Sequence, residues 1–342
     1  MNFDLIRNAT LAISAFTLRQ TSYVRGMTKR IPLALAILSG VLATVSCGDK
    51  DHLQLLAGNN NAASAEGEAM YQKAKAADDA GKASSAIKKY KLVADKYPFA
   101  PSAAQARFRQ AELLEQKGEI LKSFDVYQEF IIRFQGSGLY SKALDRQAQM
   151  AHDAADGRVK TGFAGIPFIG LKAKLPSVKI VVMLEKVRDN APRSATSAKA
   201  QFKIAELYHS EKENRKAINA YRKLVRDQPN SKYAAEALFR VGVVLMEEAE
   251  GGNRNQSTLD LADEAFRDYL VQYPGHAKNA EARRLIGTLK SKDLDRSLGI
   301  AEFYDRSGQT ESAKVYYRDV MKKSSSGAAH DKAKARLKEL GE

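Results

Sequence analysis

The sequence of 342 residues has little of what several common protein classes depend on. Its one cysteine allows no internal disulfide, so packing must hold the fold. Its five histidines are far apart, with no HExxH or His-Cys spacing, which argues against a metal site. No GxGxxG, Walker or GxSxG motif is present. The sequence therefore predicts no catalytic residue, no cofactor and no small-molecule substrate, and a chain that is not an enzyme.

Signals for β-structure are also missing. No stretch shows sustained alternation of polar and apolar residues with β-branched side chains, so we expect almost no sheet. The eight prolines and 22 glycines fall mostly between periodic segments, as they do in helices joined by turns. These absences together predict an all-α fold.

One segment, GKASSAIKKYKLVADKYP at Gly81–Pro98, shows how the helices are paired. Gly81 permits the positive φ of a turn, and Ala86, five residues later, lets two helices approach closely. Tyr90 lies one turn further on the same face and fills the groove between them. Pro98 disfavours helix at the residue before it. This arrangement is typical of the second half of a tetratricopeptide (TPR) repeat.

The same spacing recurs, in whole or in part, along the chain. The small or apolar anchor residues are Ala86, Ser123, Ile180, Ala217, Ala262 and Ala313. Repetition in register predicts an all-α, TPR-like α-solenoid of five to six helical hairpins over residues 68–340. The last helix, 328–340, would cap the open end. An ordinary helical bundle is the alternative.

Helix bounds follow from the same pattern. The expected helices are 68–80, 84–97, 102–117, 119–134, 139–156, 177–190, 195–210, 214–227, 231–250, 258–272, 278–307 (one long or kinked helix), 310–322 and 328–340.

An insertion, residues 157–176, interrupts the third hairpin. It is rich in glycine, proline and apolar residues, including Phe163, Ile166, Phe168 and Ile169. One interpretation is a loop that contacts a partner protein. A loop that packs on the neighbouring repeat is equally compatible with the composition.

The N-terminal residues predict a signal peptide over 1–46. A basic segment, Met27–Arg30, precedes a 15-residue apolar run at 31–45, which is shorter than the roughly 20 residues that span a membrane. Because residues 1–26 precede a complete signal, we expect Met27 to be the true start and 1–26 to be a mis-called extension.

The single cysteine, Cys47, follows the apolar run directly. This resembles a bacterial lipobox, in which the cysteine is lipidated, although Thr44 stands where leucine is usual. Acyl chains on Cys47 would anchor the chain to a membrane. Residues 47–67 would form a flexible tether with a reach of about 25 Å. Gly48, in place of aspartate, favours the outer membrane by resemblance only.

The net charge is +15, and residues 1–46 carry five basic residues and one acidic residue, which leaves +11 for the remainder. The basic residues are spread over every helix, so solvated helix faces account for most of the charge. A secreted chain does not meet nucleic acid, and we expect none as a partner. Anionic lipid headgroups or acidic partner segments could use the remaining charge.

Taken together, the cysteine, the tether and the hairpins resemble the BamD family of outer-membrane assembly lipoproteins. The segments that carry the resemblance are AIKKYKLVADKYPFAPSAAQARFRQAELLEQKGE, SFDVYQEFIIRFQGS, AINAYRKLVRDQPNSKYAAEALFRVG and AFRDYLVQYPGHAKNAEARR. The resemblance implies five TPR repeats on the periplasmic side of the outer membrane. It implies two partners, a β-barrel assembly protein and unfolded outer-membrane proteins. The insertion, the sixth hairpin and the length depart from the family.

Two non-enzymatic functions stay open at this point. The first is a scaffold that captures extended peptide segments in a groove lined by the first helices of the hairpins, with Tyr71, Lys75, Asp78, Phe108 and Glu112 as candidate residues. For Tyr71 and Phe108 the pattern favours a role in the core between helices. The second is an envelope TPR adaptor that coordinates peptidoglycan synthesis or membrane constriction; the N-terminal coiled coil common in such proteins is absent.

Overall fold

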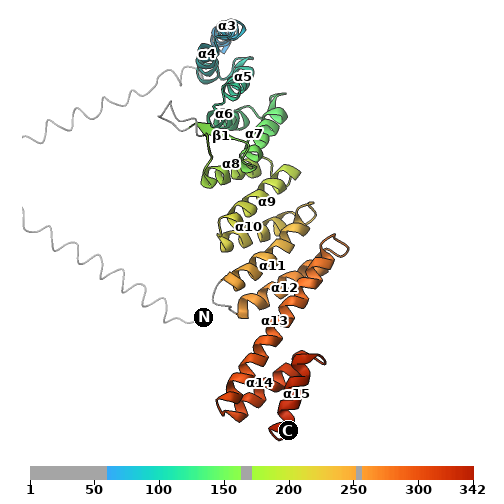
Figure 1. Cartoon of the computed structure of the whole chain (residues 1–342). Coiled ribbons are helices and arrows are strands. Elements are labelled where there is room, and N and C mark those ends of the chain that lie inside the picture. Colours follow the sequence, from blue (N-terminus) through green and yellow to red (C-terminus); the bar gives the residue numbers. More distant parts are fainter. Residues whose placement is uncertain (1–59, 163–171, 252–255) are drawn as a thin grey trace, which may run out of the picture. The chain divides into compact units, whose positions relative to one another are not determined.

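A computed structural model describes residues 60–162, 172–251 and 256–342 (Figure 1). The chain divides into two compact units, Met1–Ala63 and Ser64–Glu342, and almost everything described here belongs to the second. Several predictions lie outside the described residues: the signal peptide, Cys47, and Phe163, Ile166, Phe168 and Ile169 of the insertion.

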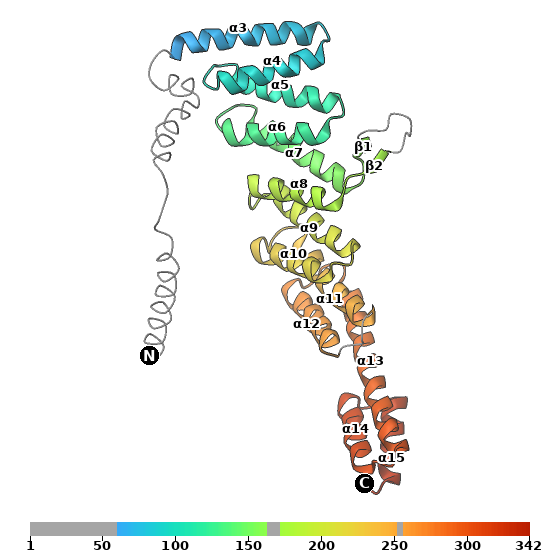
Figure 2. The same cartoon turned by 90° about the vertical axis from the view of Figure 1, so that its left-hand side faces the viewer.

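The second unit is a succession of helical hairpins. From α4 onward each helix packs against the next, so neighbours in sequence are neighbours in space (Figure 2). The pairs are α3 (Asn60–Asp79) with α4 (Ala83–Lys96), α5 (Ala103–Gln116) with α6 (Ile120–Arg133), α7 (Tyr140–Ala155) with α8 (Ser177–Asn190), α9 (Ala195–Ser210) with α10 (Asn214–Asp227), α11 (Ala234–Gly251) with α12 (Gln256–Gln272), and α13 (Asn279–Arg306) with α14 (Thr310–Lys323), followed by α15 (Ala328–Glu339). This confirms the TPR-like, all-α solenoid.

The anchor residues explain why the helices pair in this way. All six are buried, and so are the large residues one turn later: Tyr90, Tyr127, Leu184, Tyr221, Phe266 and Tyr317. A small residue on one helix lets its partner approach, and the large residue closes the space beside it. The turns Gly81, Gly118 and Gly308 have φ values of 71°, 74° and 73°. The equivalent turn in the fourth hairpin is made by Lys212 at φ 62°.

The first helix corrects one prediction. The tether was expected to run to residue 67, but α3 begins at Asn60, so residues 60–67 are helical. Alanine and glutamate favour helix here, and the added turns pack against the next hairpin. A Cβ atom at Gly67 would lie 2.7 Å from Cβ of Ala100. Tyr97 donates a 3.3 Å hydrogen bond from its hydroxyl to Glu66 Oε2.

The insertion begins and ends as a small antiparallel ribbon. Strands β1 (Lys160–Gly162) and β2 (Lys172–Lys174) pair in the register Lys160 with Lys174 and Gly162 with Lys172. The backbone then returns to the solenoid through Leu175, whose side chain is buried. These are the only two strands in the part of the chain that the structure describes, which agrees with the expectation of almost no sheet.

Helix α13 is a single helix of 28 residues, as its sequence predicted, and it joins two hydrophobic clusters. Its first half contributes Ala282, Ile286 and Leu289 to the main core. Its second half contributes Ala301 to a separate cluster with α14 and α15. The last hairpin and α15 therefore form a terminal module with its own core.

The main core contains one unusual polar group, His152 of α7. The side chain is buried, and neither ring nitrogen has a hydrogen-bond partner among the described residues. Burial lowers the pKa of His152 to about 4, and the nearby positive charge of Lys199 acts in the same direction. Asp156 raises the pKa and Lys203 lowers it, with smaller effects. The imidazole is therefore neutral at pH 7.

We predict that Gly242→Ala destabilises the solenoid, because a Cβ atom there would lie 2.6 Å from Cε1 of the buried Phe266 ring. The expected loss in the free energy of unfolding is about 1–3 kcal/mol, measured by urea denaturation. The matched control is Gly287→Ala in α13, where a Cβ atom meets nothing within 4 Å. There we expect a gain of up to about 1 kcal/mol from helix propensity. Equal effects of the two substitutions would contradict the close contact.

His152 predicts a pH dependence of stability. Its pKa in the folded state, about 4, is below the usual value of 6.5, so the unfolded chain binds more protons between these values. The contribution is fully present above pH 6.5 and is lost as the pH falls to 4, by up to roughly 3 kcal/mol. Urea denaturation of His152→Leu across this range should show a shallower decline than the parent chain. A Gly287→Ala control, which changes no titratable group, should keep the parent's decline, and an unchanged decline in His152→Leu would refute the assignment.

Candidate functional site

The five residues predicted to line a groove surround one hollow of about 610 Å³. Tyr71, Lys75 and Asp78 come from α3, and Phe108 and Glu112 come from α5. The hollow is completed by residues of α4 and α7, so it spans the start of the solenoid. The periodicity that places side chains three and four residues apart on one helix face brings these groups together.

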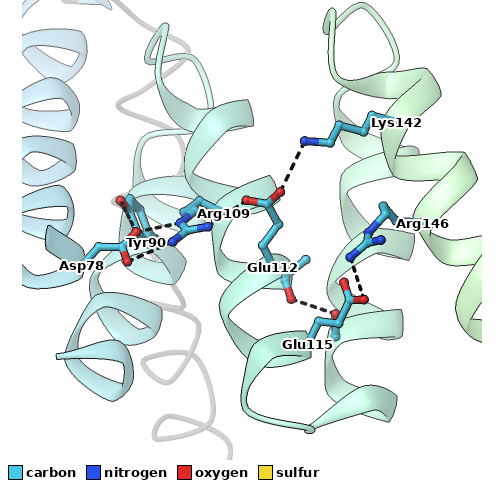
Figure 3. A network of polar contacts seen from close by, with 9 residues as sticks. Asp78, Tyr90, Arg109, Glu112, Glu115, Lys142 and Arg146 are labelled. Carbon is cyan, nitrogen blue, oxygen red and sulfur yellow. Dashed lines mark hydrogen bonds and ion pairs between the residues drawn. The ribbon is translucent and has the colours of Figure 1, made fainter. Parts of the chain in front are cut away.

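An ion pair between two lining residues, Asp78 and Arg109, joins α3 to α5 (Figure 3). Arg109 donates from Nε to Oδ2 of Asp78 at 2.7 Å and from Nη2 to Oδ1 at 3.2 Å. Tyr90 of α4 donates its hydroxyl to the same carboxylate at 3.2 Å. The hydrogen bond from Arg109 lowers the pKa of Asp78. We call Asp78, Tyr90, Arg109 and Glu112 the first clasp, since together they connect three helices.

The chain of ion pairs extends from α5 to α7. Glu112 Oε2 lies 3.1 Å from Nη1 of Arg109, and Oε1 lies 3.4 Å from Nζ of Lys142. The ammonium of Lys142 also lies 4.9 Å from the centre of the Phe108 ring, within reach of a cation–π interaction. Negative and positive groups therefore alternate from Asp78 through Arg109 and Glu112 to Lys142 (Figure 3).

The two aromatic candidates have different surroundings. Phe108 is buried, and its ring meets Tyr127 and Phe130 edge-on at 5.4 and 5.7 Å, so its main role is in the core. Tyr71 is half-buried; it donates its hydroxyl to Gln105 Oε1 at 3.3 Å, and its ring lies 5.7 Å from that of Tyr90. Tyr71 thus offers one ring face beside the hollow. Lys75 is exposed and forms no ion pair within the described residues.

The sequence analysis missed Arg109, Tyr90 as a hydrogen-bond donor, and Lys142. The sequence did contain a signal for Arg109 and Tyr90, because the same residue types occur again 227 positions later. The second clasp consists of Asp305, Tyr317, Arg336 and Glu339.

The geometry of the second clasp repeats that of the first. Arg336 lies 2.5 and 3.0 Å from the two oxygens of Asp305, and Tyr317 donates to Asp305 at 3.1 Å. Burial raises the pKa of Tyr317 to about 12. A second hollow of about 400 Å³ lies beside this clasp. Its lining residues occupy the positions of the first hollow shifted by 227, with Ala335 where the first has Phe108.

The described residues contain neither a metal-binding cluster nor a helix that could span a membrane. No group of three or more histidine, cysteine, aspartate or glutamate side chains is placed to hold a metal ion there. Within the same ranges, no helix has both the length and the apolar character needed to cross a membrane.

Comparison with protein families gives two matches. Residues 179–339 match the YfiO family, described as an outer membrane lipoprotein, and residues 68–100 match a tetratricopeptide-repeat family. The matches confirm the resemblance drawn from the repeat segments. No curated protein matches the chain.

Solved TPR structures resemble the chain at low identity. The TPR domain of P58(IPK) is 18% identical, with a TM-score of 0.34 over 80% of this chain and 77% of that one. The C-terminal part of a TPR repeat-containing protein from Cytophaga hutchinsonii is 15% identical, with a TM-score of 0.33 over 78% and 86%. MamA from Desulfovibrio magneticus is 13% identical, with a TM-score of 0.28 over 62% and 97%. These scores are too low to support a functional assignment.

We predict that the first clasp stabilises α3 on α5. Arg109→Met should raise the pKa of Asp78 and speed amide hydrogen exchange in α3, because the half-buried carboxylate loses its charged partner. A double-mutant cycle with Asp78→Asn should give a coupling energy of about 0.5–1 kcal/mol, a value typical of a solvent-accessible pair. Arg133→Met, which leaves the clasp intact, is the control. A coupling energy of zero would contradict this role.

Proposed function

We propose, from the match of residues 179–339 to the YfiO family of outer membrane lipoproteins, that this chain is a non-enzymatic scaffold. It binds partner proteins and extended peptide segments in the assembly of β-barrel outer-membrane proteins. The observation that supports the binding role is the hollow across α3, α5 and α7, in which charged groups alternate and are held by hydrogen bonds before any ligand arrives.

The chemistry of the hollow suits an extended backbone. A peptide in this conformation presents amide N–H and C=O groups at regular intervals. Carboxylate oxygens of Glu112 accept hydrogen bonds from N–H groups, and the ammonium groups of Lys75 and Lys142 donate to C=O groups. The exposed face of Tyr71 receives an apolar side chain. Because the clasp already fixes Glu112 and Arg109, little ordering is needed on binding.

The membrane anchor belongs to the same proposal. The signal at residues 27–46 directs export, and Cys47 carries acyl chains that hold the chain on the periplasmic face of the outer membrane. With α3 beginning at Asn60, the tether shortens to residues 47–59, with a reach of about 20 Å. The hollow at α3 is then the part of the solenoid closest in sequence to the anchor. The proposed partners are a β-barrel assembly protein and unfolded outer-membrane proteins.

We predict that Cys47→Ser abolishes incorporation of labelled palmitate and moves the chain from the membrane fraction to the soluble periplasmic fraction. The reason is that serine cannot form the thioether of a lipidated cysteine. Mass spectrometry of the parent chain should find Cys47 acylated at the N-terminus. An unmodified Cys47 that still carries the signal peptide would contradict the proposed lipid anchor.

The peptide-binding role is tested with a fluorescently labelled peptide from the C-terminal strand of an outer-membrane β-barrel. Lys75→Glu combined with Lys142→Glu should weaken binding at least fivefold in fluorescence anisotropy, because two donors become acceptors. The matched control, Lys88→Glu with Lys96→Glu, makes the same charge change on α4, away from the hollow. Equal weakening in both variants would show that only net charge matters.

The assembly role is tested by purifying the lipidated chain from outer membranes. Recovery of a β-barrel protein with periplasmic repeats supports it. Recovery of only murein synthases or Tol-type proteins would favour the peptidoglycan-linked adaptor instead.

A further inference from the structure

Helices α14 and α15 correspond position by position to α4 and α5. The offset of 227 residues relates both ends of α4 to those of α14, Ala83 to Thr310 and Lys96 to Lys323. It also relates the four residues of the first clasp to those of the second, and the turn at Gly81 to that at Gly308. The same two-helix surface is therefore present twice in the chain, once near each end of the solenoid.

At the N-terminal end this surface is covered. Arg107 of α5 is buried and forms ion pairs with Asp95 of α4 and, at 3.1 Å, with Glu129 of α6. Arg133 of α6 donates a 3.3 Å hydrogen bond to the carbonyl of Ala94. Helix α6 thus packs along α5 and reaches α4 through Arg133, and it brings charges of both signs to this surface.

At the C-terminal end the equivalent groove is open. It is a hollow of about 970 Å³ between α14 and α15, and no described helix lies over it. The offset places Met321 at the position of Ala94, and Ala335 at that of Phe108. Together with the buried Leu337 these side chains give the groove an apolar floor.

The groove has become more positive at two positions, while one acidic residue of the lining, Asp331, stands where α5 has Ala104. Lys322 replaces Asp95, Lys334 replaces Arg107, and Lys338 replaces Ala111. All three lysines are exposed and form no ion pair within the described residues. The remaining cation of the lining, Arg318, is paired with Glu342. An occupant that brought basic residues, as α6 brings Arg133, would meet like charges here.

We propose that the groove between α14 and α15 binds an acidic amphipathic helix of a partner protein, in the position that α6 takes on α4 and α5. The apolar stripe of the helix packs on Met321, Ala335 and Leu337. Glutamate or aspartate residues beside the stripe pair with Lys322, Lys334 and Lys338. This is the helix-in-groove mode of recognition, with anchors at i, i+3, i+4 and i+7. The site is separate from the hollow across α3, α5 and α7, and goes beyond the function proposed above.

The test uses a labelled probe, a synthetic 18-residue helix with leucine at i, i+3, i+4 and i+7 and glutamate on both flanks. Fluorescence anisotropy with the full chain should show saturable binding that weakens as salt is raised. The triple variant Lys322→Glu, Lys334→Glu, Lys338→Glu should weaken binding at least tenfold. A control triple variant with the same charge change, Lys73→Glu, Lys88→Glu, Lys96→Glu, should bind as the parent does.

A second variant, Ala335→Trp, fills the groove while the lysines stay in place. It should also weaken binding at least tenfold, with an unchanged circular dichroism spectrum. Binding that tracks only net charge, with equal losses in both triple variants, would overturn the proposal. So would concentration-dependent dimerisation that the Lys322, Lys334, Lys338 variant abolishes, since the occupant would then be a second copy. Sedimentation with phosphatidylglycerol vesicles that depends on these lysines, without probe binding, would assign the groove to a lipid surface instead.

Discussion

The close approach of paired helices at a small residue is the constraint on which the rest of the structure depends. Ala86, Ala217, Ala262 and Ala313 are completely buried, and a large side chain one turn later is buried beside each. At these four positions the side chain at the close approach is a methyl group, and at Gly242 even a methyl group would overlap the ring of Phe266. Because each hairpin is fixed in this way, the first helices present their outer faces in register, and residues more than 30 positions apart line one hollow.

The polar groups of that hollow are organised before any ligand binds. Asp78 and Glu112 share Arg109 between them, and Glu112 also meets Lys142. Partly buried ion pairs that water still reaches add little stability. Their main effect is positional, because they hold acceptors and donors at fixed places on the surface. The hollow is suited to segments that differ in sequence but share an extended backbone, as the proposed binding of peptide segments requires.

Sequence periodicity predicted most helices to within a few residues, because the spacing of turn glycine, small anchor and aromatic residue recurs, in whole or in part, from hairpin to hairpin. It failed at residues 60–67, where asparagine and alanine resemble a linker and the contact that orders them, Gly67 against Ala100, is more than 30 residues away. The periodicity identified Asp78 and Glu112 by the helix face on which they lie. It did not identify Arg109, because nothing in the sequence distinguishes this arginine from the others before its distance to Asp78 is known. The strands β1 and β2 have three residues each and leave no periodic signal.

Helix α13 joins two parts of the solenoid that have separate hydrophobic clusters. Its two halves belong to different hydrophobic clusters, Ile286 and Leu289 to one and Ala301 to the other. Neither cluster needs the other to exclude water. The terminal module can therefore gain or lose order as a body while the preceding hairpins stay intact, since only the short stretch of α13 between Leu289 and Leu294 joins the two clusters. Changes to the docking groove of α14 and α15 would then leave the hollow at α3 undisturbed, which lets the two ends of one chain evolve for different partners.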